Sequence, residues 1–146
     1  RFANAYVTNG VTTGSDEREK QNIASLTSAE ITAATAISKL FKTYKWKDKV
    51  AAKGDAARTH TGVVAQQVET AMSDAGLDAS KYAFWCSDTW WQVDGGEPYD
   101  TQEEAPEGAT ERNRKGIRYP ELLAFIGAAT EQRLTSIEAR LDALEG

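Results

Sequence analysis

Four apolar residues near the end of the chain constrain its fold more than any other feature. They are separated by three, four and three positions: Leu134, Ile137, Leu141 and Leu144. This is the a and d spacing of a coiled coil, whose seam must be covered by another helix. The spacing therefore predicts a helix over residues 120–145 that assembles with copies of itself.

Charged residues flank this seam and favour a parallel arrangement. They occupy g positions and the e positions that follow: Arg133 and Arg140, then Glu138 and Glu145. Farther back, the register places Gly127 and Thr130 on the seam, so the pattern is sustained over only about two heptads. The alternative is a single amphipathic helix that lies on its own domain.

Size and composition exclude several classes of function. The 146 residues favour one domain, and a net charge of -5 argues against a nucleic-acid partner. No apolar run is long enough to cross a bilayer. The single cysteine, Cys86, and the single histidine, His60, do not suffice for a disulfide within the chain or a typical zinc site. We expect no metal, no cofactor and no membrane partner.

The pattern along the chain predicts a small α+β domain of short strands and helices. Thr27 and Glu30 form a capping box for a helix over 27–41, and a strand is expected at 44–47. A strand leads into a helix from Thr59, with Val64, Val68, Ala71, Met72 and Ala75 on its inner face. The remaining segments are expected to be a loop at 47–59, a strand at 82–93, an exposed loop at 94–116 and a strand at 117–119.

The first residues differ in character from the rest. Residues 1–14 are poor in charge, and Asn9-Gly10 is a turn signal that predicts strand–turn–strand. A run of charged and amide side chains begins at Ser15. We place a boundary here, between a β-rich upstream segment (1–14) and a second unit (15–146).

Two interpretations fit the segment that starts at this boundary. In one, Ser15 caps a helix and Asp16 pairs with Lys20 one turn later. In the other, Ser15 is a nucleophile and Lys20 is its general base, which requires a neutral, buried amine. Positions five apart point about 140° away from each other on an α-helix, so the second interpretation requires Ser15 to lie outside any helix.

Five segments, taken together and in this order, resemble the C-terminal intramolecular chaperone domain of phage tail spikes, tail fibres and endosialidases. The resemblance covers about residues 13–146. The segments are GSDEREKQNI (14–23), YKWKDK (44–49), THTGVVAQQVETA (59–71), YAFWCSDTWW (82–91) and GIRYPELLAFI (116–126).

The resemblance implies an assembly chaperone that cleaves itself off. Such domains bring three fibre chains into register in the host cytoplasm and are then released, while the upstream fibre remains in the virion tail. When the functional residues of that family are carried over to this sequence, the resemblance implies that Ser15 is the nucleophile and Lys20 is the base. The bond between Gly14 and Ser15 is then the one that is cut. The implied partners are two further copies of the chain and the upstream fibre segment. Some relatives carry a histidine where this chain has Asn22.

Other residues in the matching segments are candidates to orient the base or stabilise an oxyanion: Asp16, His60, Gln66 and Arg118. Each also has an ordinary structural interpretation, as a cap, a loop hydrogen bonder, a polar helix residue and a surface ion pair. The aromatic run Phe84, Trp85, Trp90 and Trp91 is either packing or a sugar-binding platform. Two rival functions therefore remain, a non-cleaving trimeric tip that binds host glycans and a structural end-cap.

Overall fold

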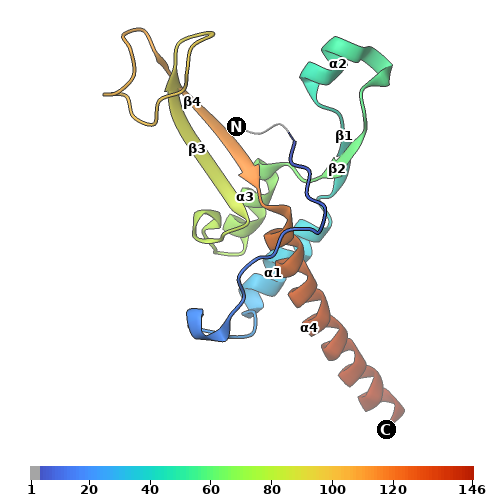
Figure 1. Cartoon of the computed structure of the whole chain (residues 1–146). Helices are drawn as coiled ribbons and strands as arrows, with labels where there is room; N and C mark the ends of the chain where they lie inside the picture. Colours follow the sequence, from blue (N-terminus) through green and yellow to red (C-terminus); the bar gives the residue numbers. More distant parts are fainter. Residues whose placement is uncertain (1–3) are drawn as a thin grey trace.

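The computed structural model describes residues 4–146, in which helices alternate with two separate antiparallel strand pairs (Figure 1). The α-helices are α1 (Ser28–Ser38), α2 (Lys47–Lys53), α3 (Ala65–Asp74) and α4 (Tyr119–Glu145). The strands are β1 (Lys42–Tyr44), β2 (His60–Gly62), β3 (Trp85–Gln92) and β4 (Thr110–Ile117). Short 3₁₀ turns are η1 (Glu17–Glu19), η2 (Gly54–Ala56) and η3 (Ala79–Lys81). The prediction of a small α+β domain that ends in a helix is confirmed.

Helix α1 begins at the predicted capping box. The Thr27 hydroxyl accepts a hydrogen bond from the Glu30 amide at 3.2 Å, and the Glu30 carboxylate accepts one from the Thr27 amide at 2.8 Å. These two bonds satisfy amides that have no partner inside the helix. The helix ends at Ser38, earlier than predicted, and the chain then enters β1.

The core lies where α1, α3 and the first third of α4 meet the start of β3. Its larger buried side chains are Ile37, Val68, Met72, Phe84, Trp85, Leu122 and Phe125. Val68 and Met72 confirm the predicted inner face of α3, and Gly76, with a positive φ of 81°, ends the turn that follows. The prediction that Val64 lies on this inner face is wrong, because Val64 precedes α3 and its side chain is 49% exposed.

Strands β1 and β2 form an arm that carries α2 at its tip (Figure 1). Tyr44 pairs with His60 in this short ladder. The predicted strand at 44–47 and loop at 47–59 are wrong, because β1 ends at Tyr44 and α2 begins at Lys47. The Ala- and Lys-rich stretch 47–53 has enough helix propensity to form α2 once the arm holds its ends together.

The arm is joined to α4 through Tyr119. The Tyr119 hydroxyl accepts a hydrogen bond from the Val63 amide at 3.0 Å. It also lies against Gly62, where an added Cβ would collide with the tyrosine oxygen. Glycine at position 62 therefore permits the close approach that fixes the arm to the start of α4.

Strands β3 and β4 form a longer hairpin, with Trp85 opposite Ile117 and Gln92 opposite Thr110. The predicted loop at 94–116 is therefore too long, because residues 110–116 belong to β4, and the predicted last strand at 117–119 is instead the end of β4 followed by the start of α4. The polar sequence of β4 has little strand propensity of its own, so pairing with β3 decides its conformation.

The segment before α1 makes few contacts with the body. Residues 4–25 are exposed, and residues 4–14 contain a bend at Thr8 and Asn9 but no strand. The strand–turn–strand prediction is wrong over the described part of this segment, and residues 1–3 lie outside the described residues. A strand needs a hydrogen-bonded neighbour, and nothing in the described chain pairs with this segment.

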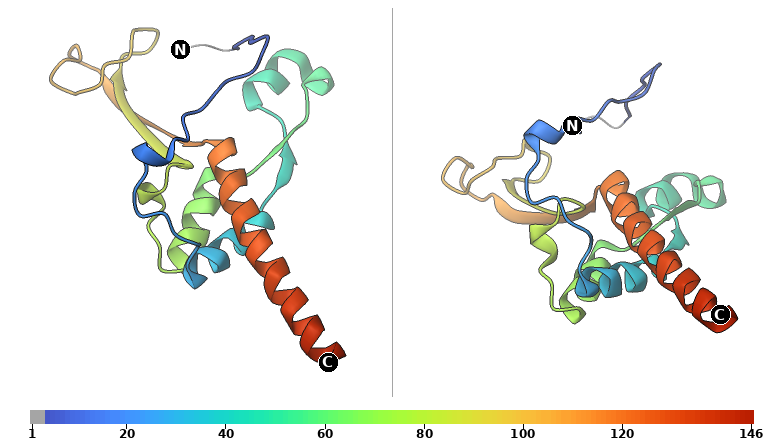
Figure 2. Two further views of the ribbon diagram at one scale, coloured as in Figure 1. Left: turned by 60° about the horizontal axis from the view of Figure 1, so that its bottom comes forward. Right: turned by 90° about the horizontal axis from the view of Figure 1, so that it is seen from below.

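Helix α4 extends well beyond the body, with its C-terminal end projecting alone (Figures 1 and 2). Its buried residues, Leu122, Phe125 and Ala129, all lie in its first half, and residues 133–146 are exposed. The predicted seam is uncovered, with exposed fractions of 46%, 45%, 51% and 84% for Leu134, Ile137, Leu141 and Leu144. The alternative of a helix that lies on its own domain describes only the beginning of α4.

We expect Ile37→Ala to lower the free energy of unfolding by about 2–5 kcal/mol, because Ile37 is fully buried and its loss leaves a cavity. Ile23→Ala is the matched control, since Ile23 is 72% exposed and should change stability by less than about 0.5 kcal/mol. Urea titration followed by circular dichroism measures both. Equal effects of the two substitutions would contradict the assignment of the core.

The capping box predicts a pH dependence of stability. The hydrogen bond from the Thr27 backbone amide holds the pKa of Glu30 below its ordinary value of 4.5. Burial acts in the opposite direction, and side-chain hydrogen bonds with Tyr82 and Thr27 lower the pKa further. A lowered pKa in the folded state stabilises the fold above pH 4.5, and this contribution is lost as the pH falls through the folded-state value.

Glu30→Gln keeps the geometry of a capping box but does not titrate. We therefore expect unfolding free energies of the variant to fall less steeply than those of the wild type below about pH 4.5. Urea titrations between pH 3 and 7 compare the two slopes. Parallel curves would show that Glu30 does not carry this pH dependence.

Candidate functional site

Ser15 and Lys20 are in direct contact. The Lys20 Nζ atom donates a hydrogen bond to the Ser15 Oγ atom at 2.7 Å. Ser15 precedes η1 and so lies outside any helix, which meets the geometric condition for a pair of residues five positions apart. The same distance allows a neutral lysine to accept the proton of the serine hydroxyl.

A single 3₁₀ turn brings the two side chains together. Asp16 has extended backbone and caps η1, and Lys20 returns to extended backbone, with its amide bonded to the Glu17 carbonyl at 3.2 Å. Two residues later, Asn22 adopts a positive φ of 56°. Asparagine is one of the few residues other than glycine that tolerate this conformation. This backbone role was not predicted from the sequence, where the available signal is a polar Asn after a charged turn.

Asp16 contacts Arg18 and leaves Lys20 free for Ser15. The Arg18 guanidinium donates to the Asp16 carboxylate at 2.7 and 3.1 Å, and the Arg18 amide donates at 2.9 Å. The Arg18 side chain and then its amide hold the pKa of Asp16 below its ordinary value. The alternative in which Ser15 is the cap and Asp16 pairs with Lys20 is therefore wrong: Asp16 is the cap and Arg18 is its partner.

The pair lies at the surface of the single chain. Ser15, Lys20 and Gly14 are all exposed, and a Cβ added to Gly14 would meet open space. Among the described residues, Asn22 is the only non-glycine with a positive φ, and neither Gly14 nor Ser15 has one. The burial that a neutral lysine requires therefore does not come from this chain.

Three of the candidate supporting residues lie in other parts of the fold. His60 stacks on Tyr44 in the arm, with ring centroids 5.5 Å apart, and Gln66 is exposed in the first turn of α3. The Arg118 guanidinium donates to the Ala83 carbonyl at 2.7 Å, and its amide donates to the Phe84 carbonyl at 2.9 Å. Within residues 4–146, no hydrogen bond or ion pair joins any of the three to the Ser15–Lys20 pair.

The four aromatic residues of the β3 region do not form one surface. Phe84 and Trp85 are buried in the core, with exposed fractions of 3% and 8%, while Trp90 and Trp91 are half-buried farther along the strand. The Trp85 indole donates to the Ala65 carbonyl at 3.0 Å, which ties β3 to α3. Packing therefore accounts for Phe84 and Trp85, and a sugar platform built from all four residues is wrong.

Across residues 4–146, no three His, Cys, Asp or Glu side chains gather closely enough to hold a metal ion. No helix in the described part of the chain has both the length and the apolarity to span a membrane.

Comparisons with known proteins identify the family. A family model described as chaperone of endosialidase matches residues 15–77. A crystal structure titled as a novel intramolecular chaperon is 32% identical, with a TM-score of 0.66, and the match covers 84% of this chain and 99% of that one. The chain belongs to the chaperone-of-endosialidase family.

Other proteins to which the chain is similar are components of phage tails. The carboxy-terminal domain of the bacteriophage T5 L-shaped tail fibre, solved with its intramolecular chaperone domain, is 29% identical with a TM-score of 0.73, over 97% of this chain and 34% of that one. A probable tail spike protein of Klebsiella phage 0507-KN2-1 is 39% identical over 94% of this chain. The chain spans only 12% of the length of that spike protein.

The match to the chaperone-of-endosialidase family begins at Ser15 and runs through α1, the arm and α3. The family is a peptidase family, which implies a serine peptidase-like processing activity. The chain is therefore an intramolecular chaperone domain of the kind found in phage tail fibres and spikes, and the resemblance inferred from the five sequence segments is confirmed.

Proposed function

We propose that this domain aligns three chains of a phage tail fibre or spike and then releases itself by cutting the bond between Gly14 and Ser15. The observation that carries the proposal is the 2.7 Å hydrogen bond between Lys20 Nζ and Ser15 Oγ. A serine hydroxyl becomes a useful nucleophile when a base in direct contact takes its proton. Ser15 is also the residue at which the family match begins.

The proposed reaction is an acyl shift followed by hydrolysis. Lys20 takes the proton from the Ser15 hydroxyl, and the Ser15 oxygen attacks the carbonyl carbon of Gly14. The bond from that carbon to the Ser15 nitrogen then breaks, and the nitrogen takes a proton to become a free amine. Water hydrolyses the resulting ester, which leaves a Gly14 carboxylate and restores the Ser15 hydroxyl. Each domain cuts once, because the bond that it cuts is its own.

The exposure of the pair fits a reaction that depends on assembly. A lysine in water is charged and cannot accept a proton, so a neutral amine requires a drier environment than the single chain provides. In the proposal, the upstream fibre or a neighbouring copy covers Ser15 and Lys20. Cleavage would then follow assembly, and the released fibre would be held by a kinetic barrier against unfolding.

The first experiment tests the roles of the two residues. The chain is expressed with its upstream fibre, and products are separated by gel and weighed by mass spectrometry. We expect the wild type to release a fragment that begins at Ser15, while Ser15→Ala and Lys20→Ala stay intact. Circular dichroism checks that each variant is folded.

Lys20→Arg is the informative control for the base. Arginine keeps a positive charge and can donate a hydrogen bond to Ser15, but it does not give up its proton in proteins. We therefore expect cleavage to slow by at least about 100-fold, as for loss of a general base. Cleavage of Lys20→Arg at the wild-type rate would exclude Lys20 as the base, and cleavage of Ser15→Ala would exclude the reaction altogether.

The trimer in this proposal rests on α4. Its uncovered seam repeats at coiled-coil spacing, and burying a leucine or isoleucine side chain contributes about 1.5–3 kcal/mol. Arg140 and Glu145 lie beside the seam at positions where charges of parallel neighbours pair.

Ile137→Glu tests the seam, because it would place several carboxylates in one buried layer. Ala139→Glu is the matched control, since position 139 lies on the opposite side of the heptad. We expect light scattering to give a trimer mass for the wild type and Ala139→Glu, and a monomer mass for Ile137→Glu. A monomeric wild type, or a trimeric Ile137→Glu, would contradict the proposed seam.

A further inference from the structure

A groove with a volume of about 840 Å³ lies between the arm and the base of the β3–β4 hairpin. Its lining includes three aromatic and four cationic residues: Tyr44, Trp46 and Tyr119, and Lys45, Lys47, Arg114 and Lys115. Asp48 is the only carboxylate among the lining residues. The groove therefore combines apolar contact surface with an excess of positive charge.

The cations of this groove have no anionic partner within the described chain. The ion pairs among residues 4–146 are Arg18 with Asp16 and Arg112 with Asp94. Arg114 lies over the Trp90 ring at 5.5 Å, and Lys115 donates to Ser87 and Asn113 at 3.1 and 2.9 Å. Lys45 donates only to the Asp55 carbonyl, at 3.4 Å. These contacts position the charges without neutralising them.

The opposite charge is concentrated in the loop that joins β3 to β4. Residues 93–109, here called the acidic loop, contain no Lys or Arg but hold Asp94, Glu97, Asp100, Glu103, Glu104 and Glu107. All six carboxylate residues are exposed. Only Asp94 is in an ion pair within the described residues, so the others are available to a partner.

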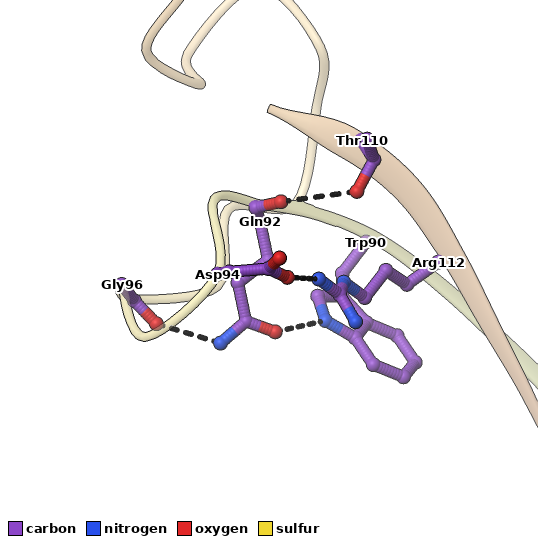
Figure 3. Close-up of polar contacts among 6 residues, drawn as sticks. All are labelled: Trp90, Gln92, Asp94, Gly96, Thr110 and Arg112. Atoms are coloured by element: carbon purple, nitrogen blue, oxygen red, sulfur yellow. Dashed lines mark hydrogen bonds and ion pairs between the residues drawn. The ribbon is translucent and has the colours of Figure 1, made fainter. Parts of the chain in front are cut away.

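The base of the acidic loop is held by polar contacts, as Figure 3 shows. The Gln92 side chain accepts from the Trp90 indole at 2.9 Å and donates to the Gly96 carbonyl at 2.6 Å. Arg112 pairs with Asp94 across the hairpin. Since the hairpin is pinned at this point, the loop is presented away from the body and does not collapse onto it.

The acidic loop does not reach the groove of its own chain. The loop and the α2 tip of the arm extend to opposite sides of the molecule in all three views (Figures 1 and 2). No residue of 93–109 lines the groove, so one chain carries two separate surfaces of opposite charge. The opposite charges of two such surfaces can pair when each surface contacts the complementary surface on a rotated copy of the chain.

We propose that the acidic loop of one copy docks in the groove of the next copy. Such a head-to-tail contact closes on itself when three copies are related by a threefold axis. This inference rests on the trimer of the proposed function and names a second surface that stabilises it. It would supplement a seam that extends over only about two heptads, fewer than the three or four of a confident coiled coil.

Cross-linking of the full chain with its upstream fibre tests the contact. Nitrogen-15-labelled and unlabelled copies are expressed separately, mixed and refolded together. They are then treated with a carbodiimide that joins a carboxylate directly to a lysine, and the products are analysed by mass spectrometry. We expect links from Glu103 or Glu104 to Lys45, Lys47 or Lys115 that combine both labels. Links confined to one label, or links from the groove to the upstream fibre, would overturn the inference.

Charge-reversal substitutions provide a second test of the contact. One double variant reverses charge in the acidic loop, Glu103→Lys with Glu104→Lys, and another reverses it in the groove, Lys45→Glu with Lys47→Glu. We expect each to lower the yield of inter-copy links by about tenfold. The yield is measured from links at residues that remain unchanged: Glu97, Asp100 and Lys115. Combining the two pairs of changes should restore the yield, because the opposite charges meet again. Lys81→Glu with Glu69→Lys is the control outside both surfaces and should leave the yield unchanged.

Light scattering on the same samples separates this inference from the trimer itself. A trimeric wild type without loop-to-groove links would overturn the docking contact while the α4 seam stands. A monomeric wild type without mixed-label links would overturn both. Loss of links that the combined variant fails to restore would also count against the contact.

Discussion

The packing of the first third of α4 holds the rest of the structure in place. Leu122 is fully buried against the core, and the Phe125 ring lies 5.0 Å from that of Phe84. Tyr119, one turn earlier, fixes the arm through Val63. Because α4 is one continuous helix of 27 residues, anchoring its first turns also sets the direction of its second half, which projects about 20 Å from the body. The core of each chain thus sets the orientation of the surface that we propose for assembly.

The Ser15–Lys20 pair is held by a different kind of structure. It depends on one short turn, the Asp16 cap and the reversal at Asn22, and it takes nothing from the core. The chain itself places a serine hydroxyl and a lysine amine at contact distance but leaves both in solvent. In the proposed mechanism this separation is useful, since a site completed only by covering the turn would stay inactive until the fibre has formed.

The distribution of charge follows the same division between body and projections. The net charge of -5 conceals an arm rich in lysine and a hairpin loop that carries only acidic charges. Apart from Asp94, no charge on either projection is in an ion pair within the described residues. Their opposite signs would guide copies toward one mutual orientation, which is the requirement that a device for aligning long repetitive chains must meet.

The sequence by itself determined the features that depend on local spacing. These are the capping box at Thr27, the inner face of α3, the helix at the end of the chain with its apolar seam, and the family to which the five segments belong. Local hydrogen bonds and helical periodicity act over a few residues, so they can be predicted from neighbouring letters. The pairing of Ser15 with Lys20 was anticipated as one of two alternatives, and the single 3₁₀ turn decided between them.

Only the tertiary structure decided the rest. The polar strand β4 exists because β3 holds it, α2 forms because the arm closes its ends, and Val64 is exposed because α3 begins one residue later. Arg118 stabilises the junction between the hairpin and α4 by donating hydrogen bonds to the Ala83 and Phe84 carbonyls. These partners come from a distant part of the sequence. Contacts between segments far apart in the chain are fixed by which surfaces bury one another, and no local pattern records that choice.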